Sequence, residues 1–69
     1  MEPRDRIRKL LVLGDNRLKQ GDARILVKAR ESYEEALALA REAGLEGQVA
    51  PLVELRLAEV DRLSKDSNV

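Results

Sequence analysis

The sequence predicts an all-α fold made of three antiparallel helices, and three observations indicate it. Ala, Leu, Glu, Arg and Lys dominate the chain, and 38% of its residues are charged, which is typical of helical proteins. Apolar residues recur at steps of three and four instead of alternating. Two glycine-containing breaks, at residues 21–22 and 44–48, divide the chain into three segments. Such short connections require neighbouring helices to run antiparallel.

The first helix is expected over residues 4–20. Pro3 suits a first helical position, where its missing N–H has no consequence. Gly14 lies in mid-helix, where glycine costs about 1 kcal/mol relative to alanine, so we expect another helix to approach closely there. Gly21 can end the helix in a left-handed conformation, and Asp22 can cap the next one. One apolar face collects Ile7, Leu10, Leu11, Gly14 and Leu18.

The second helix is expected over residues 23–43. Its main apolar stripe consists mostly of alanine, which lets a neighbouring backbone come close. Ile25, Val27, Ala38 and Leu39 lie off this stripe, so the helix is apolar on more than one side and should lie between the other two. Gly44 followed by Leu45 favours a Schellman end. The stripe comprises Leu26, Ala29, Tyr33, Ala36, Leu37, Ala40 and Ala43.

The third helix is expected over residues 49–64, after a loop from Gly44 to Gln48. Pro51 would lie in its first turn, and residues 65–69 should form a frayed end. The 69 residues suffice for a single three-helix domain. The main apolar face of this helix comprises Val49, Leu52, Val53, Leu57, Val60 and Leu63.

The stretch LGDNRLKQGD, followed by ARESYEEALALAREAG, resembles the tetratricopeptide repeat, a pair of antiparallel helices. The resemblance implies that Gly14 and Ala29 are small because the paired helices touch there, and that Tyr33 fills the space beside Gly14. Ala36 would pack against the third helix, which would act as a capping helix or as the start of a next repeat. The helix-packing motif comprises Gly14, Leu18, Gly21, Ala29, Tyr33, Ala36 and Leu37.

The chain departs from this repeat in three ways. The spacing from Gly21 to Ala29 is about three residues longer than in the repeat, no aromatic residue lies near the start of the first helix, and Gly44 replaces the usual closing proline. Some repeats bind a terminal carboxylate through an asparagine, but the matching Asp15 would repel one. An unrelated bundle with a Tyr-centred core and an MIT-like three-helix domain remain alternatives. The resemblance to the tetratricopeptide repeat and the resemblance to the MIT domain both imply a protein-binding module.

The residue types present argue against catalysis and cofactors. The chain contains neither Cys nor His, so disulfides are excluded, and a structural zinc, a general base of the commonest kind and a thiol nucleophile are not expected. Ser32, Ser64 and Ser67 have no evident activating partner. We therefore expect no enzyme, metal or cofactor. The lack of an apolar run long enough for a membrane span, or of a secretory signal, favours the cytoplasm.

The charges are unevenly distributed although the net charge is zero. Residues 1–30 carry nine basic and four acidic side chains, whereas residues 31–69 carry four basic and nine acidic ones. The basic part of one chain could therefore meet the acidic part of another. Nucleic-acid binding is an alternative, although stacking aromatic residues are missing. Its candidate basic patch comprises Arg4, Arg8, Lys9, Arg17 and Arg24.

The apolar residues outnumber what three helices can hide. A chain this short buries little more than half of its surface, and stacked repeats normally cover one another. We predict a homodimer with a two-fold axis, in which surplus apolar residues meet. The alternatives are a docking face for a different protein, a fragment of a longer repeat array and a designed helical scaffold. The candidate interface comprises Val12, Ile25, Leu39, Leu52 and Leu55.

Overall fold

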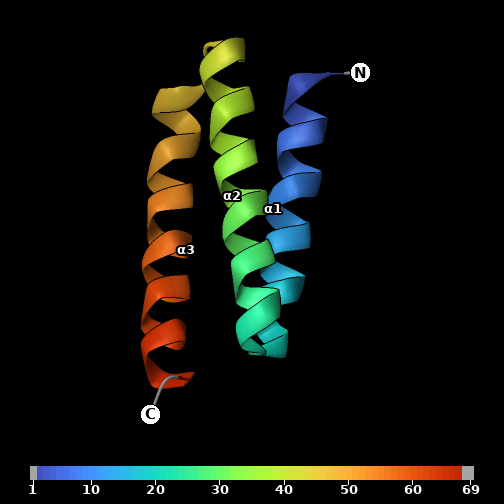
Figure 1. Cartoon of the computed structure of the whole chain (residues 1–69). Coiled ribbons are helices and arrows are strands. Elements are labelled where there is room, and N and C mark those ends of the chain that lie inside the picture. The colour runs from blue at the N-terminus through green and yellow to red at the C-terminus, as the bar shows by residue number, and fades with distance from the viewer. Residues whose placement is uncertain (1, 68–69) are drawn as a thin grey trace.

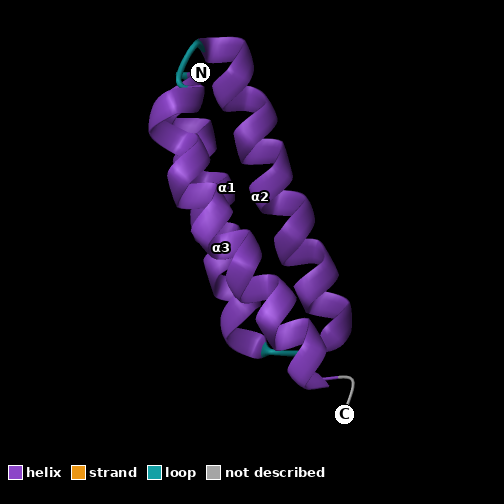
Figure 2. Cartoon of the chain, turned by 90° about the vertical axis from the view of Figure 1, so that its left-hand side faces the viewer, coloured by secondary structure: helices purple, strands orange, loops and turns teal. Residues whose placement is uncertain are grey.

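A computed structural model describes residues 2–67 and, within them, contains three helices and no strand. These are α1 (Pro3–Gln20), α2 (Ala23–Ala43) and α3 (Glu46–Ser67). The predicted all-α, three-helix class is thus confirmed. Helix α2 lies between its neighbours and packs against both of them (Figure 1). Viewed from the side, α3 lies in front of α1, and both lie on the same side of α2 (Figure 2). Consecutive helices are antiparallel, so α1 and α3 run in the same direction.

The two breaks between the helices have the predicted geometry. Gly21 is left-handed, with φ of 70°, and the Asp22 carboxylate accepts the Arg24 N–H at 2.8 Å. Gly44 is also left-handed, with φ of 73°. The Leu45 N–H then donates to the Ala40 carbonyl at 2.7 Å, which is the six-to-one hydrogen bond that characterises a Schellman end. Both turns are therefore fixed by local chemistry that the sequence displays.

Helix α3 is longer than the predicted 49–64 at both ends. The Leu45 carbonyl accepts the N–H groups of Gln48 and Val49, each at 3.0 Å, so the helix begins directly after the Schellman turn and leaves no loop up to residue 48. Pro51 is consequently the sixth residue of α3 and not part of its first turn. Residues 65–67 are helical and not frayed, while residues 68–69 of the predicted end lie outside the described residues.

Tyr33 occupies the centre of the core, fully buried beside Gly14. A Cβ atom added to Gly14 would lie only 2.5 Å from Cε1 of the Tyr33 ring, which explains why this mid-helix position lacks a side chain. The expected packing of Tyr33 against Gly14 is confirmed. Most of the other core residues are small or β-branched, so the helices approach closely: Ile7, Leu26, Ala29, Ala36, Ala40, Val49, Val53 and Val60.

Candidate interaction surface

One hydrogen-bonded cluster joins all three helices on the side where α1 and α3 meet. The Tyr33 hydroxyl of α2 donates to Asp15 Oδ1 of α1 at 2.5 Å. Arg56 of α3 donates to the same carboxylate, from Nε to Oδ1 at 2.9 Å and from Nη2 to Oδ2 at 3.4 Å. Arg56 also donates to the Leu52 carbonyl at 3.2 Å. The two-point contact orients the guanidinium and sets the register of α1 against α3.

The charges in this cluster stabilise one another. Burial alone would raise the pKa of the Asp15 carboxyl, but hydrogen bonds from Arg56 and Tyr33 and the positive charge of Arg56 outweigh it and lower the pKa. Burial and the hydrogen bond to Asp15 raise the pKa of the Tyr33 hydroxyl. The hydrogen bond to Asp15 also raises the pKa of Arg56. All three groups therefore hold their usual charge at neutral pH, which suits a structural cluster better than a proton-transfer site.

A second polar contact fastens the other edge of α1 to α2. Arg17 donates to the Ser32 hydroxyl at 2.9 Å and to the Lys28 carbonyl at 3.2 Å. Ser32 is buried and itself donates to the Lys28 carbonyl at 3.1 Å. The hydroxyl is thus fully engaged in helix packing.

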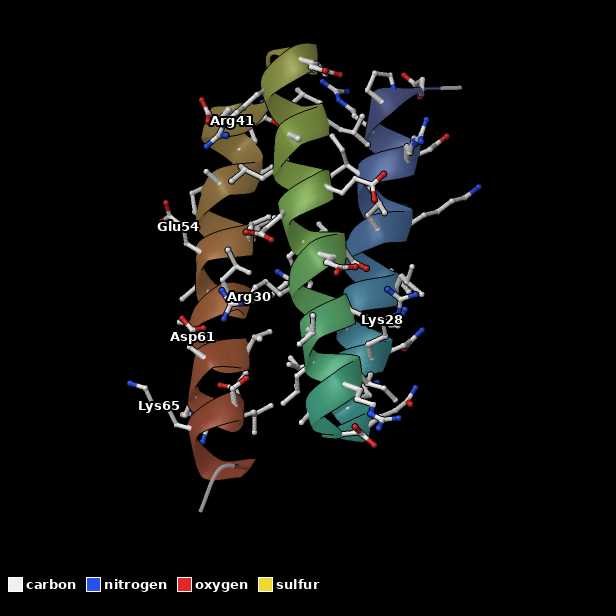
Figure 3. The ribbon with its side chains drawn as sticks, in the orientation of Figure 1. Lys28, Arg30, Arg41, Glu54, Asp61 and Lys65 are labelled. Carbon is white, nitrogen blue, oxygen red and sulfur yellow. The ribbon has the colours of Figure 1, made fainter. Side chains whose placement is uncertain are left out.

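Ion pairs at the surface join α2 to α3 on the side away from α1. Arg30 pairs with Asp61, and Figure 3 shows the two side chains pointing toward each other across the helix boundary. Arg41 pairs with Glu46 at 2.5 Å, near the turn between the helices. Glu54 projects outward from α3 in the same view. Exposed pairs of this kind contribute little individually, so the apolar core and the part-buried cluster of Asp15, Tyr33 and Arg56 contribute more to the stability.

Three large apolar side chains stay exposed beside the cluster. Val12 of α1 is 50% exposed, and Leu52 and Leu55 of α3 are 45% and 73% exposed. Val12 precedes Asp15 by three residues and Leu52 precedes Arg56 by four, so each lies one turn from the ion pair on its own helix. The ion pair therefore places Val12 and Leu52 at the same level. We call the surface of Val12, Asp15, Leu52, Leu55 and Arg56 the α1/α3 face.

The other two residues of the predicted interface are not part of this face. Leu39 is partly buried and packs against the core, because it lies on the side of α2 that faces the start of α1, beside Pro3 and Arg6. Ile25 is also partly buried. Two exposed apolar residues were missing from the prediction: Leu13 on α1, and Val27 on the outer side of α2.

The predicted basic residues are spread along the molecule. Arg4, Arg8 and Lys9 lie in the first half of α1, whereas Arg17 and Arg24 lie near the opposite end, where α1 gives way to α2. Arg17 is also committed to Ser32 and Lys28. The residues of the packing motif gather in or beside the core or at a turn, with Leu18 and Leu37 partly buried against it.

The Asp15–Tyr33–Arg56 cluster itself was not foreseen. The sequence contains one indication of this cluster, because a buried tyrosine hydroxyl usually needs a hydrogen-bond partner. Nothing in the sequence pairs Asp15 with Arg56, because the two residues are far apart along the chain and only the folded register brings them together. The resemblance to the tetratricopeptide repeat concerns Asp15 only as a group that would repel a terminal carboxylate.

No protein-family model, curated protein or solved structure matches the chain. Within the described residues, no cluster of three acidic, histidine or cysteine side chains is placed to hold a metal ion. None of the described helices is both long and apolar enough to span a bilayer.

Proposed function

We propose that this chain is a non-enzymatic protein-interaction module that binds a second copy of itself through the α1/α3 face. The observation that carries the proposal is the grouping of Val12, Leu52 and Leu55, all about half exposed or more, at one level of one face. Exposed apolar residues scattered singly need no explanation. A group on one side of a small domain marks a contact surface.

The size of the apolar contribution favours a moderate affinity. Covering a half-exposed Val or Leu contributes about 1 kcal/mol, and a two-fold contact covers each of Val12, Leu52 and Leu55 twice. The resulting stabilisation of about 6 kcal/mol must be combined with packing of the surrounding face to offset the entropy lost on association. A dissociation constant in the micromolar range, about −8 kcal/mol, is the expected outcome.

The local geometry supports a tetratricopeptide-like hairpin with α3 as its capping helix. The close packing of Gly14 against Tyr33, the left-handed Gly21 and the small Ala29 and Ala36 agree with what that resemblance implies. In such arrays each repeat covers its neighbour, and here a second copy would do so. The cytoplasmic location remains a prediction from the sequence.

Catalysis and nucleic-acid binding have less support. The polar side chains of the α1/α3 face are engaged with one another, and Arg17 is bonded to α2. Of the remaining cations of the predicted patch, Arg4, Arg8 and Lys9 lie in the first half of α1, whereas Arg24 lies at the start of α2, near the opposite end of the molecule. Salt-sensitive binding of mixed DNA and RNA by the chain, with no self-association, would favour the nucleic-acid alternative instead.

Two matched valines test the proposal. Val12 on α1 and Val27 on α2 are 50% and 57% exposed, and both lie within helices. Sedimentation velocity at tens of micromolar should give a dimer for the original chain and for Val27→Lys, and a monomer for Val12→Lys. Circular dichroism checks that each variant keeps its helices. A monomeric original chain, or equal disruption by both substitutions, would overturn the proposal.

A further inference from the structure

We propose that the two copies meet on a two-fold axis that runs across the α1/α3 face at right angles to its helices, so that α1 packs antiparallel on α1 and α3 on α3. This inference rests on the proposed function and specifies its partner surface, which is the same face of a second copy. It pairs Asp5 of each copy with Lys19 of the other. The spacing of residues on both helices, and the level that the two helices share, lead to it.

Helix α1 carries a stripe that becomes complementary to itself when it is reversed. Asp5, Val12 and Lys19 are all exposed and follow one another at intervals of seven residues, which is close to two full turns, so they lie on one line along the helix. A two-fold axis at Val12 brings the two Val12 side chains together and places Asp5 of each copy level with Lys19 of the other. Within the described part of the chain, neither Asp5 nor Lys19 belongs to an ion pair, so both charges are available to a partner.

The antiparallel direction also keeps the cations of α1 apart. The helix carries six basic and two acidic side chains, so a parallel contact would place each cation level with the same cation of the other copy. Reversal about Val12 places no cation of α1 level with another one. Arg8 falls level with Asn16 of the other copy. Lys9 falls level with Asp15. Avoiding like charges selects the direction of a contact more than it strengthens the contact.

Helix α3 has the same property about a point midway between Leu52 and Leu55. These residues are 45% and 73% exposed, and reversal about their midpoint makes Leu52 of each copy meet Leu55 of the other. Glu59 then lies level with Gln48 of the other copy, and its carboxylate is already paired with Arg62, so no like charges meet at this level. A contact in which each residue of a pair meets the other in both directions closes at two chains.

The two points of reversal lie at one height, which a single axis requires. The ion pair between Asp15 and Arg56, at 2.9 Å, joins α1 to α3, and the two helices run in the same direction. Val12 precedes Asp15 by three residues, a rise of about 4.5 Å. The midpoint of Leu52 and Leu55 precedes Arg56 by two and a half residues, a rise of about 4 Å. Because both helices lie on the same side of α2 (Figure 2), one axis serves both contacts.

A charge exchange tests the pairing. Asp5→Lys places like charges at both ends of the α1 contact, and so does Lys19→Asp, so each substitution alone should weaken dimerisation by about tenfold. A chain with both substitutions again pairs opposite charges and keeps a net charge of zero. Sedimentation should give this chain a dimer affinity within about threefold of the original. Glu34→Lys is the matched control, because it changes the net charge as Asp5→Lys does but lies two turns beyond Val27 on the outer side of α2; it should leave dimerisation unchanged.

A second measurement leaves every charge in place. The chain lacks cysteine, so a single introduced thiol reports on its own contact. Under mild oxidation, Val12→Cys should form a disulfide-linked homodimer faster than Val27→Cys, because Val12 meets itself at the axis. In an equimolar mixture with Leu52→Cys, the Val12→Cys chain should still link to itself. A preference for mixed disulfides would overturn the antiparallel pairing.

The outcomes separate the two proposals. If the original chain is a monomer, the proposed function itself fails. If the original chain dimerises but the double charge exchange does not restore the affinity, or if Val12→Cys links no faster than Val27→Cys, only the antiparallel pairing fails. Circular dichroism checks the helices of the charge variants, and where one of them has unfolded, the thiol chains decide the question.

Discussion

Replacing Gly14 with alanine should destabilise the protein, although the same change stabilises most helices. The new Cβ would lie 2.5, 2.8 and 2.9 Å from Cε1, Cζ and Cδ1 of the Tyr33 ring. All three distances are shorter than normal van der Waals contact. The ring is fully buried and its hydroxyl is bonded to Asp15, so it cannot move aside without breaking that bond.

The magnitude follows from three opposing effects. Alanine gains about 1 kcal/mol over glycine in helix propensity. Overpacking of the core costs about 1–3 kcal/mol, and weakening the hydrogen bond between Tyr33 and the charged Asp15 costs about 1.5 kcal/mol. The net expectation is a loss of about 2 kcal/mol in the free energy of unfolding. For a domain of this size, such a loss lowers the melting temperature by about 10 °C.

Urea unfolding monitored by circular dichroism measures this change, and the chain provides its own control. Gly47 is also helical, but a Cβ added there meets nothing within 4 Å. Gly47→Ala should therefore raise the stability by up to about 1 kcal/mol. In a Tyr33→Leu background the obstructing ring is gone, and Gly14→Ala should become neutral or stabilising. Stabilisation by Gly14→Ala in the original chain would refute this account of the core.

Two other substitutions probe the cap and the polar cluster. Asp22→Ala removes the carboxylate that accepts the Arg24 N–H and should lower the free energy of unfolding by about 1 kcal/mol; an unchanged urea midpoint would contradict the capping role. Asp15 has a lowered pKa in the folded chain, so its contribution is present at neutral pH and is lost as the pH falls below about 4, through the folded pKa. Asp15→Asn should therefore lower the stability at pH 7 and flatten its acid dependence, and a parallel dependence would show that the Arg56 and Tyr33 contacts are unimportant.

The local features of the fold could be predicted because single residues determine them. Gly21 and Gly44 adopt the left-handed backbone conformation that favours glycine. Asp22 caps the second helix by accepting a hydrogen bond from Arg24, which is two residues further along the chain. The start of α3 was harder to predict, since Pro51 suggested a first turn. The bonds that begin the helix come instead from the Leu45 carbonyl of the Schellman turn, and helix ends are generally the least certain bounds.

The candidate face was only partly predictable for a different reason. Periodicity identifies which residues are apolar but not which side of a helix a neighbour covers. Val12, Leu52 and Leu55 are exposed as expected, whereas Leu39 is covered by the start of α1. The Asp15–Arg56 contact depends on the register of two helices that are not consecutive. Neither the composition nor the helical spacing of apolar residues predicts the register of α1 against α3.

Methyl NMR spectra recorded over a dilution series test the central claim most directly, because they report on each exposed side chain separately. Self-association through the α1/α3 face predicts that the Val12, Leu52 and Leu55 methyl resonances shift with concentration while those of Val27 stay constant. Spectra that superimpose from micromolar to millimolar concentration, or shifts confined to Val27, would contradict the claim.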